Sequence, residues 1–264
     1  MINKPIVGVA ALIFVLVAGG AYYLRTRNQP VPAAPNTPAT PAPASPEPGI
    51  AHPLPQGAGN AASTGPLPEL ADSDGPLRDA LGQISSLDAV KDFLAPQDLI
   101  RKIVVTIDNL PRQKVAVEKR PVNATAGSFE AKGDELHATL DQRNFDRYKP
   151  MVAVVSQLDS KQLGALYIHY YPLFQESYQN LGYPNGYFND RLVEVIDNLL
   201  ATPELKGPIE LVRPNVMYTY ADPAIEGRTA GQKLLIRMGP ENARAIKAKL
   251  TELRAVITAA PLKH

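Results

Sequence analysis

The stretch between residues 25 and 69 most constrains the fold of this chain, because it cannot form a core. It holds twelve prolines between positions 30 and 68, interleaved with alanine, and Glu47 is the only charged side chain between residues 28 and 68. Each proline removes a backbone donor and fixes φ, so we expect a solvated, extended chain with about 3.1 Å of rise per residue. We interpret residues 25–69 as a spacer with a reach on the order of 100 Å. A PxxP ligand is the alternative.

An uncharged apolar run precedes the spacer. Residues 6–24, IVGVAALIFVLVAGGAYYL, would form a helix about 28 Å long, close to the hydrocarbon thickness of a bilayer. Aromatic and basic side chains then lie where lipid headgroups would be: Tyr22, Tyr23, Arg25 and Arg27. The run predicts a transmembrane helix over residues 6–24 after a short tail, residues 1–5. A signal peptide cleaved near Ala18–Gly20 is the alternative.

The flanking charges give little guidance on orientation. Lys4 precedes the apolar run and two arginines follow it, so the positive-inside count is nearly even. An anchor close to the N-terminus, followed by an uncharged spacer and a soluble domain, favours a cytoplasmic N-terminus. We therefore expect a single-pass protein of the bacterial inner membrane, with its soluble domain in the periplasm.

The composition of residues 70–264 excludes several classes of function. Excluding Lys4, Arg25 and Arg27 from the 27 basic residues, and Glu47 and Glu69 from the 26 acidic ones, leaves 24 of each. Such a balanced domain lacks the basic footprint of a nucleic-acid binder. The absence of cysteine excludes disulfides, thiol catalysis and zinc-thiolate sites.

The motifs of common enzymes and metal sites are also missing. The histidines are too far apart in the sequence for a typical metal-binding pair: His52, His137, His169 and His264. We find neither a Gly-x-Ser-x-Gly nucleophile elbow nor a glycine-rich phosphate loop. No metal and no cofactor are therefore expected.

Apolar residues recur every three or four positions through most of residues 70–264, which predicts a mainly α-helical domain, an irregular helical bundle. Capping residues and prolines divide the pattern into helices. We expect one capped by Asp72 or Ser73 and reaching Ile84; one with Pro96 in its first turn and stopped by Pro111; one from Asn144 or Asp146 to Leu158; one capped by Asp159, reaching Leu181 and stopped by Gly182; one capped by Asn189 and ended by Thr202; one capped by Thr229; and one with Pro240 in its first turn. Pro172 should bend or split the fourth.

Two regions depart from the helical period. Residues 209–220 alternate over two short runs, IELV and VMYTY, which predicts a small β-hairpin. Residues 112–143 suit extended chain or short strands better than helix.

The last helix has the clearest amphipathic pattern. Its apolar face carries Ala243, Ile246, Leu250, Leu253 and Ile257. Its polar face is expected to carry Arg244, Lys247, Lys249, Glu252 and Arg254. We expect the apolar stripe to pack onto the domain, and a dimer seam is the alternative.

Tyrosines gather between residues 167 and 220, and tyrosine suits both interfaces and half-buried core positions. If they share a surface, this Tyr-rich face is the predicted binding site, with a loop at residues 181–188 at its rim. The candidate binding residues are Tyr167, Tyr171, Tyr178, Tyr183, Tyr187, Asn189, Arg191, Tyr218 and Arg237. The alternative is that the tyrosines bridge core and water.

One pair resembles a catalytic motif. Glu176-Ser177 is similar to the Glu-Ser pair of lytic transglycosylases, where the glutamate is the general acid and base and must be partly desolvated. The Gly-Leu-Met-Gln segment and the tyrosine block of that family are absent. Glu176 is therefore a catalytic candidate only in an alternative interpretation.

Three segments together resemble a known family: GYPNGYFNDRLVEVIDNLLATPE, IELVRPNVMYTYADPAIE and GQKLLIRMGPENARAIKAKLTELR. The chain is similar over about residues 70–257 to a bacterial family of single-pass membrane proteins classed only as a domain of unknown function. Its most specific piece is the run Arg237–Asn242. The resemblance implies an envelope protein with an anchor, a spacer and a mainly helical domain, and it implies no activity or cofactor.

We therefore expect a membrane-anchored protein whose helical domain binds another envelope protein or peptidoglycan without catalysis. The alternatives are a peptidoglycan-cleaving enzyme that uses Glu176 and a homodimer formed through the last helix.

Overall fold

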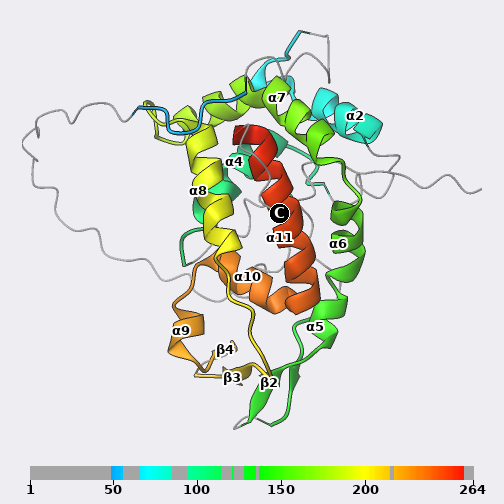
Figure 1. Ribbon diagram of the computed structural model, residues 1–264, viewed down its shortest axis with the longest axis vertical. Helices are drawn as coiled ribbons and strands as arrows, with labels where there is room; N and C mark the ends of the chain where they lie inside the picture. Colours follow the sequence, from blue (N-terminus) through cyan, green and yellow to red (C-terminus); the bar gives the residue numbers. More distant parts are fainter. Residues whose placement is uncertain are drawn as a thin grey trace, which may run out of the picture.

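The C-terminal helix α11 (Pro240–Thr258) lies at the centre of the fold (Figure 1). The computed structural model describes residues 49–55, 66–84, 94–113, 121, 128–134, 137–214 and 217–258. Within them, α11 packs against α6 (Lys149–Ser156), α7 (Ser160–Asn180), α8 (Phe188–Leu200) and α10 (Ala230–Met238). The whole predicted apolar stripe of α11 is buried inside the domain. It is therefore used for intramolecular packing.

Lys249 does not lie on the polar face of α11 as predicted. Only 6% of the residue is exposed, and its Nζ donates to the Leu158 carbonyl (2.7 Å) and to the Glu252 carboxylate (2.6 Å). The Ser160 hydroxyl donates to the same carboxylate at 2.5 Å. The prediction was wrong because neighbouring helices also cover this side of α11, and the flexible lysine stem carries the ammonium to the carbonyl that follows α6.

The first helices of the domain are α2 (Asp74–Ile84), which follows the short 3₁₀ turn η3 (Leu70–Asp72), and α4 (Leu99–Asn109). Pro96 is not in the first turn of α4, because the helix begins three residues later. Asp98 has a left-handed φ of 58° and no side-chain cap bond. The Asp74 carboxylate accepts instead from the amides of Asp98 (2.7 Å) and Leu99 (2.8 Å), so α2 supplies the cap of α4.

Two asparagines that resemble caps in the sequence are not caps. Asn144 lies inside a separate short helix, α5 (Arg143–Asp146), which precedes α6. Its amide bonds the backbone of Glu130 in both directions, at 3.0 and 2.6 Å. Asn189 is the second residue of α8, whose N-cap is Tyr187. Both side chains form hydrogen bonds with segments outside their own helices, and the local sequence does not indicate those partners.

The long helix α7 begins as predicted. The Asp159 side chain accepts from the amides of Lys161 and Gln162, and Gly182 follows the helix with a positive φ of 111°. Pro172 lies within one continuous helix, so the predicted split does not occur. Figure 1 shows α7 arching across one end of the molecule. The Thr229 cap of α10 and the start of α11 at Pro240 are likewise confirmed.

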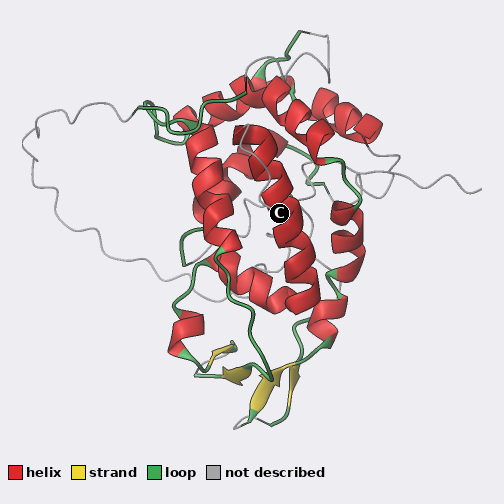
Figure 2. Cartoon of the chain, viewed as in Figure 1, coloured by secondary structure: helices red, strands yellow, loops and turns green. Residues whose placement is uncertain are grey.

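A four-stranded antiparallel sheet lies at the end of the molecule opposite α7 (Figure 2). Its order is β1 (Ala131–Lys132), β2 (Ala138–Leu140), β3 (Glu210–Val212), β4 (Thr219–Tyr220). The predicted hairpin is β3–β4, with Leu211 opposite Tyr220. The pairing of β2 with β3, Ala138 opposite Leu211, was not predicted, and neither was the short helix α9 (Pro223–Glu226). The domain is thus mainly helical with a small antiparallel sheet.

The predicted membrane helix, residues 6–24, and most of the predicted spacer lie outside the described residues. In the described ranges, no helix combines the length and apolar character needed to cross a membrane. Residues 49–55 of the predicted spacer lie against the domain beside the start of α8 (Figure 1). We call them the docked segment.

Candidate functional site

The predicted binding residues separate into two groups. Those from Tyr167 to Arg191 lie on α7, in the loop that follows it and around the start of α8. Tyr218 and Arg237 lie at the sheet end, where both contact Phe129: the Tyr218 ring is 6.0 Å from the Phe129 ring and the Arg237 guanidinium is 5.7 Å from it. The sequence-based grouping of all nine on one face is therefore not what the fold produces.

The tyrosines of α7 belong to the core. Tyr167, Tyr171 and Tyr178 are all less than 9% exposed, and the Tyr167 ring lies 5.7 Å from Tyr171 in an edge-on arrangement. Burial raises the pKa of Tyr167 well above its ordinary value of 10, and burial also raises the pKa of Tyr171. Their hydroxyls therefore stay protonated and serve as hydrogen-bond donors inside the domain.

Asn189 is fully buried at the centre of this region, and its side-chain amide makes three hydrogen bonds. Its Oδ1 accepts from the Tyr167 hydroxyl at 3.0 Å. Its Nδ2 donates to the His52 carbonyl at 2.8 Å and to the Ile257 carbonyl at 3.3 Å. One side chain thus joins α7, the docked segment and the end of α11, which explains why asparagine lies at the second position of α8.

Asp190 completes the contact with the docked segment. One carboxylate oxygen accepts from the Ala51 amide at 3.0 Å and the other from the His52 amide at 2.6 Å. Leu54, two residues further on, packs against the main hydrophobic core. The start of α8 therefore holds a bent stretch of chain by its backbone and by one apolar side chain.

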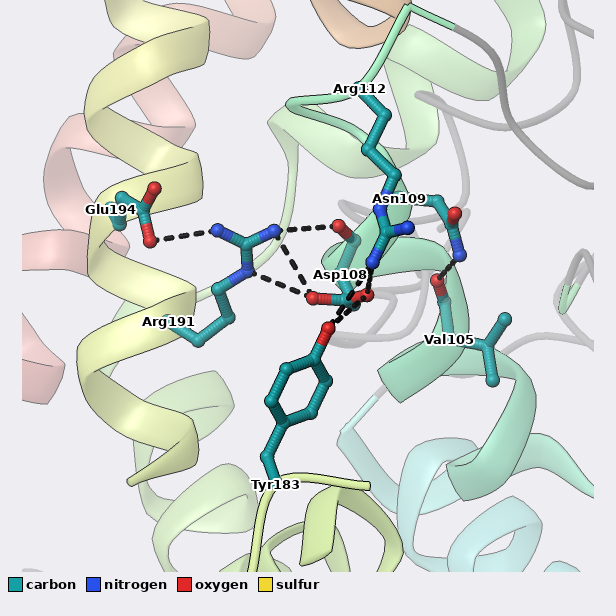
Figure 3. Close-up of polar contacts among 7 residues, drawn as sticks. All are labelled: Val105, Asp108, Asn109, Arg112, Tyr183, Arg191 and Glu194. Carbon is teal, nitrogen blue, oxygen red and sulfur yellow. Dashed lines mark hydrogen bonds and ion pairs between the residues drawn. The ribbon is translucent and has the colours of Figure 1, made fainter. Parts of the chain in front are cut away.

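A second polar cluster lies between α8 and the end of α4 (Figure 3). We name it the Asp108 cluster, and its members are Asp108, Arg112, Tyr183, Arg191 and Glu194. The Asp108 side chain is only 3% exposed and comes from the end of α4. It accepts from Arg191 Nε at 3.1 Å and from Arg112 Nη2 at 2.6 Å, and the Tyr183 hydroxyl lies 3.3 Å away.

The two arginines of the Asp108 cluster differ in exposure. The Arg191 side chain is 18% exposed, and it also donates to the Asp108 carbonyl (2.7 Å) and to Glu194 (2.8 Å). Burial lowers the pKa of Arg191, but the Glu194 and Asp108 carboxylates outweigh this effect and raise it overall. The Arg112 side chain is 54% exposed. The cluster is therefore a neutral ion-pair network that fixes α8 and the 181–188 loop against α4.

The catalytic candidate does not share this environment. Glu176 is exposed on α7. A glutamate that acts as a general acid near neutral pH needs a partly desolvated position. The structure thus provides no desolvation for this residue. Among the described residues, no three His, Cys, Asp or Glu side chains are placed to hold a metal ion.

Sequence reasoning missed Asp108 and the docked segment. Asp108 lies four residues after Val104, on the apolar face of its helix, and a charge at such a position signals a buried partner. Ile50 and Leu54 are the only isoleucine and leucine between residues 25 and 66. Two large aliphatic side chains in a Pro/Ala segment were the available sign that this part of the spacer contacts the domain.

Comparison with known proteins gives a family and no activity. A family model described as "Protein of unknown function (DUF3014)" matches residues 99–254, which is more than half of the chain. The matched range includes Asp108, Asn189, Asp190 and Arg191, and it does not include the docked segment. Neither a curated protein nor a solved structure matched the chain.

Proposed function

We propose a binding function without catalysis for this chain, which belongs to the DUF3014 family of proteins of unknown function. In this proposal the chain is a single-pass protein of the bacterial inner membrane. Residues 6–24 are its anchor, residues 25–48 are extended spacer, and the helical domain reaches into the periplasm. There it binds another envelope protein or a component of the cell wall.

The docked segment is the single observation that carries the proposal. The start of α8 holds a short stretch of main chain through Asn189 and Asp190, with bonds of 2.8, 3.0 and 2.6 Å. Hydrogen bonds to a carboxylate are stronger than neutral ones, so this surface is well suited to holding a ligand that presents amide donors. Half-buried Tyr187, the N-cap of α8, also belongs to the predicted Tyr-rich face.

The two alternatives have less support. A transglycosylase would need a desolvated glutamate, and Glu176 is exposed. A homodimer through α11 would need a free apolar stripe, and Ile246, Leu250 and Leu253 are buried against this chain's own helices.

Proximity labelling in the native host tests the proposal. A peroxidase fused to the C-terminus should label periplasmic proteins, and mass spectrometry then identifies neighbours. The same fusion carrying Asp190→Asn should lose the labelling of a specific partner at unchanged protein level. Asp197→Asn, two turns further along α8, is the matched control and should retain that labelling. Labelling of cytoplasmic proteins would overturn the orientation, and identical neighbours for all three chains would overturn the site.

A further inference from the structure

We infer that the start of α8 is a peptide-binding groove, which the docked segment occupies in cis and which a segment of a partner protein, bent in the same way, takes in its place. The inference rests on the proposed binding function and specifies the chemistry of the partner. The ligand is a polypeptide that bends where its two consecutive amides meet Asp190, with an apolar side chain in the place of Leu54.

The polar contacts define a backbone ligand. The Asp190 carboxylate accepts from the amides of two consecutive residues, Ala51 (3.0 Å) and His52 (2.6 Å). Asn189 donates to the carbonyl of His52 at 2.8 Å. All three bonds use main-chain atoms of the docked segment, so they do not require its particular sequence. Two adjacent amides followed by a carbonyl are the pattern of a polypeptide main chain, which favours a protein ligand over a glycan.

The remaining contacts give the sequence requirement. Leu54 packs against the main core cluster, whereas Ile50 is 56% exposed. Selectivity for one peptide sequence over another therefore comes from the residue at the position of Leu54, two residues after His52. Pro53 and Pro55 flank Leu54 and each fixes its own φ, which lowers the entropy lost on binding. A competing segment would need the same apolar residue and a similarly stiff backbone.

The groove is held in place by residues other than those of the docked segment. The side-chain Oδ1 of Asn189 accepts a hydrogen bond from the Tyr167 hydroxyl, and its Nδ2 also donates to the Ile257 carbonyl. Asn189 and Asp190 lie within the family match at residues 99–254, while the docked segment lies in the Pro/Ala-rich stretch outside it. The receiving residues thus belong to the family domain and the occupant does not.

Peptide binding to the full-length chain in detergent tests the inference. The probe is a fluorescent synthetic peptide, GIAHPLP, with the sequence of residues 49–55. Leu54→Asp in the protein removes the apolar contact of its own segment and opens the groove. If the groove of the wild-type chain is open about 10% of the time or less, the Leu54→Asp chain binds the probe at least about tenfold more tightly. Fluorescence anisotropy measures both affinities.

Two further chains and a second peptide identify the site. Asp190→Asn in the Leu54→Asp background should abolish probe binding, and Asp197→Asn in the same background should leave it unchanged. A probe peptide carrying Leu54→Asp should not bind. Circular dichroism checks that each chain is folded, because Leu54 contacts the core from the surface.

Three outcomes would overturn the inference. The first is the absence of probe binding to the folded Leu54→Asp chain at millimolar peptide, and the second is equal binding to the wild-type and Leu54→Asp chains. The third is a wild-type dimer that Leu54→Asp dissociates, because the occupant would then be a second copy. Labelling of cytoplasmic neighbours would refute the proposed function while leaving this in vitro result intact.

Discussion

Replacing Arg191 with alanine should destabilise the domain far more than replacing Arg112, although both arginines contact Asp108. The Arg191 side chain is 18% exposed and that of Arg112 is 54% exposed. Arg191 also donates to the Asp108 carbonyl at 2.7 Å, so its removal leaves both a buried carboxylate and a backbone acceptor short of a donor. Arg112 is mainly solvated, and water replaces it.

The magnitudes follow from these exposures. Breaking a buried ion pair by removing one partner costs about 3–5 kcal/mol, and the remaining contact of Asp108 with Arg112 brings the expected cost to about 3 kcal/mol. An exposed pair contributes about 1 kcal/mol or less. For a domain of this size, each kcal/mol lowers the melting temperature by about 2–4 °C. We expect a decrease of about 6–12 °C for Arg191→Ala and at most about 4 °C for Arg112→Ala.

Thermal unfolding followed by circular dichroism measures the difference, and Asp108→Asn supplies the control. In the Asp108→Asn background, which lacks the buried charge, Arg191→Ala should lower the free energy of unfolding by at least about 1 kcal/mol less than it does in the wild-type chain. The reason is that Asp108 and Arg191 are directly coupled. Equal effects of Arg191→Ala and Arg112→Ala, or additive effects of Asp108→Asn and Arg191→Ala, would refute the assignment of Asp108 as a buried charge held mainly by Arg191.

Three further predictions concern other parts of the domain. A Cβ at Gly164 would lie 2.1 Å from Val256 Cγ1, so Gly164→Ala should lower the free energy of unfolding, measured by chemical denaturation, by about 1–3 kcal/mol. Adding Val256→Ala should restore most of this loss. If it restores none, the α7–α11 contact is not the cause. Gly239 has a φ of 82°, and a Cβ there would lie 2.5 Å from the Phe145 ring, whereas nothing lies within 4 Å of a Cβ at Gly75. Gly239→Ala should therefore lower the melting temperature by more than Gly75→Ala does. Equal changes in melting temperature would contradict the expected backbone strain at position 239. Burial raises the pKa of Glu252, but hydrogen bonds from Lys249 and Ser160 hold it below its ordinary value of 4.5. The ionised carboxylate therefore stabilises the domain above pH 4.5, and this stabilisation is lost as the pH falls further. Chemical denaturation at pH 7 and pH 3 should show a smaller acid-induced loss of stability for Glu252→Gln than for wild type, and an equal loss would refute this role of Glu252.

Local signals in the sequence predicted much of the helical part of the fold. Asp159 and Thr229 cap α7 and α10 because a short polar side chain reaches the amides of its own first turn. Pro240 begins α11 because its missing donor is not needed there. Each of these interactions joins residues only a few positions apart, so the sequence contains them directly.

The remaining errors arise from contacts between distant residues. Asn189 has the residue type of a cap, but its amide bonds His52 and Ile257, which are 137 and 68 positions away. The sheet required β2 and β3 to meet, and Asp108 required Arg191 from a helix 83 positions further on. A single sequence shows that such groups need partners and does not show which partners they find.

The run Arg237–Asn242, on which the resemblance to a known family mainly rested, forms a structural corner between helices. Gly239 ends α10 with a backbone that side chains disfavour, and Pro240 begins α11 immediately after it. The Asn242 amide donates to the Phe145 carbonyl (2.9 Å) and to the Met238 carbonyl (2.7 Å), which joins this corner to α5. The corner is thus explained by the geometry of the fold and gives no reason to assign it a ligand.

The docked segment lies at the other end of α11, where the Ile257 carbonyl accepts from Asn189. A 19-residue helix is about 28 Å long, so the corner and the groove are separated by most of the length of the domain. A variant at Gly239 should therefore change the stability of the domain while leaving the groove of the folded fraction intact, whereas Asp190→Asn should change binding first. Because the two effects can be measured separately, a loss of partner binding can be attributed to the groove and not to a general loss of structure.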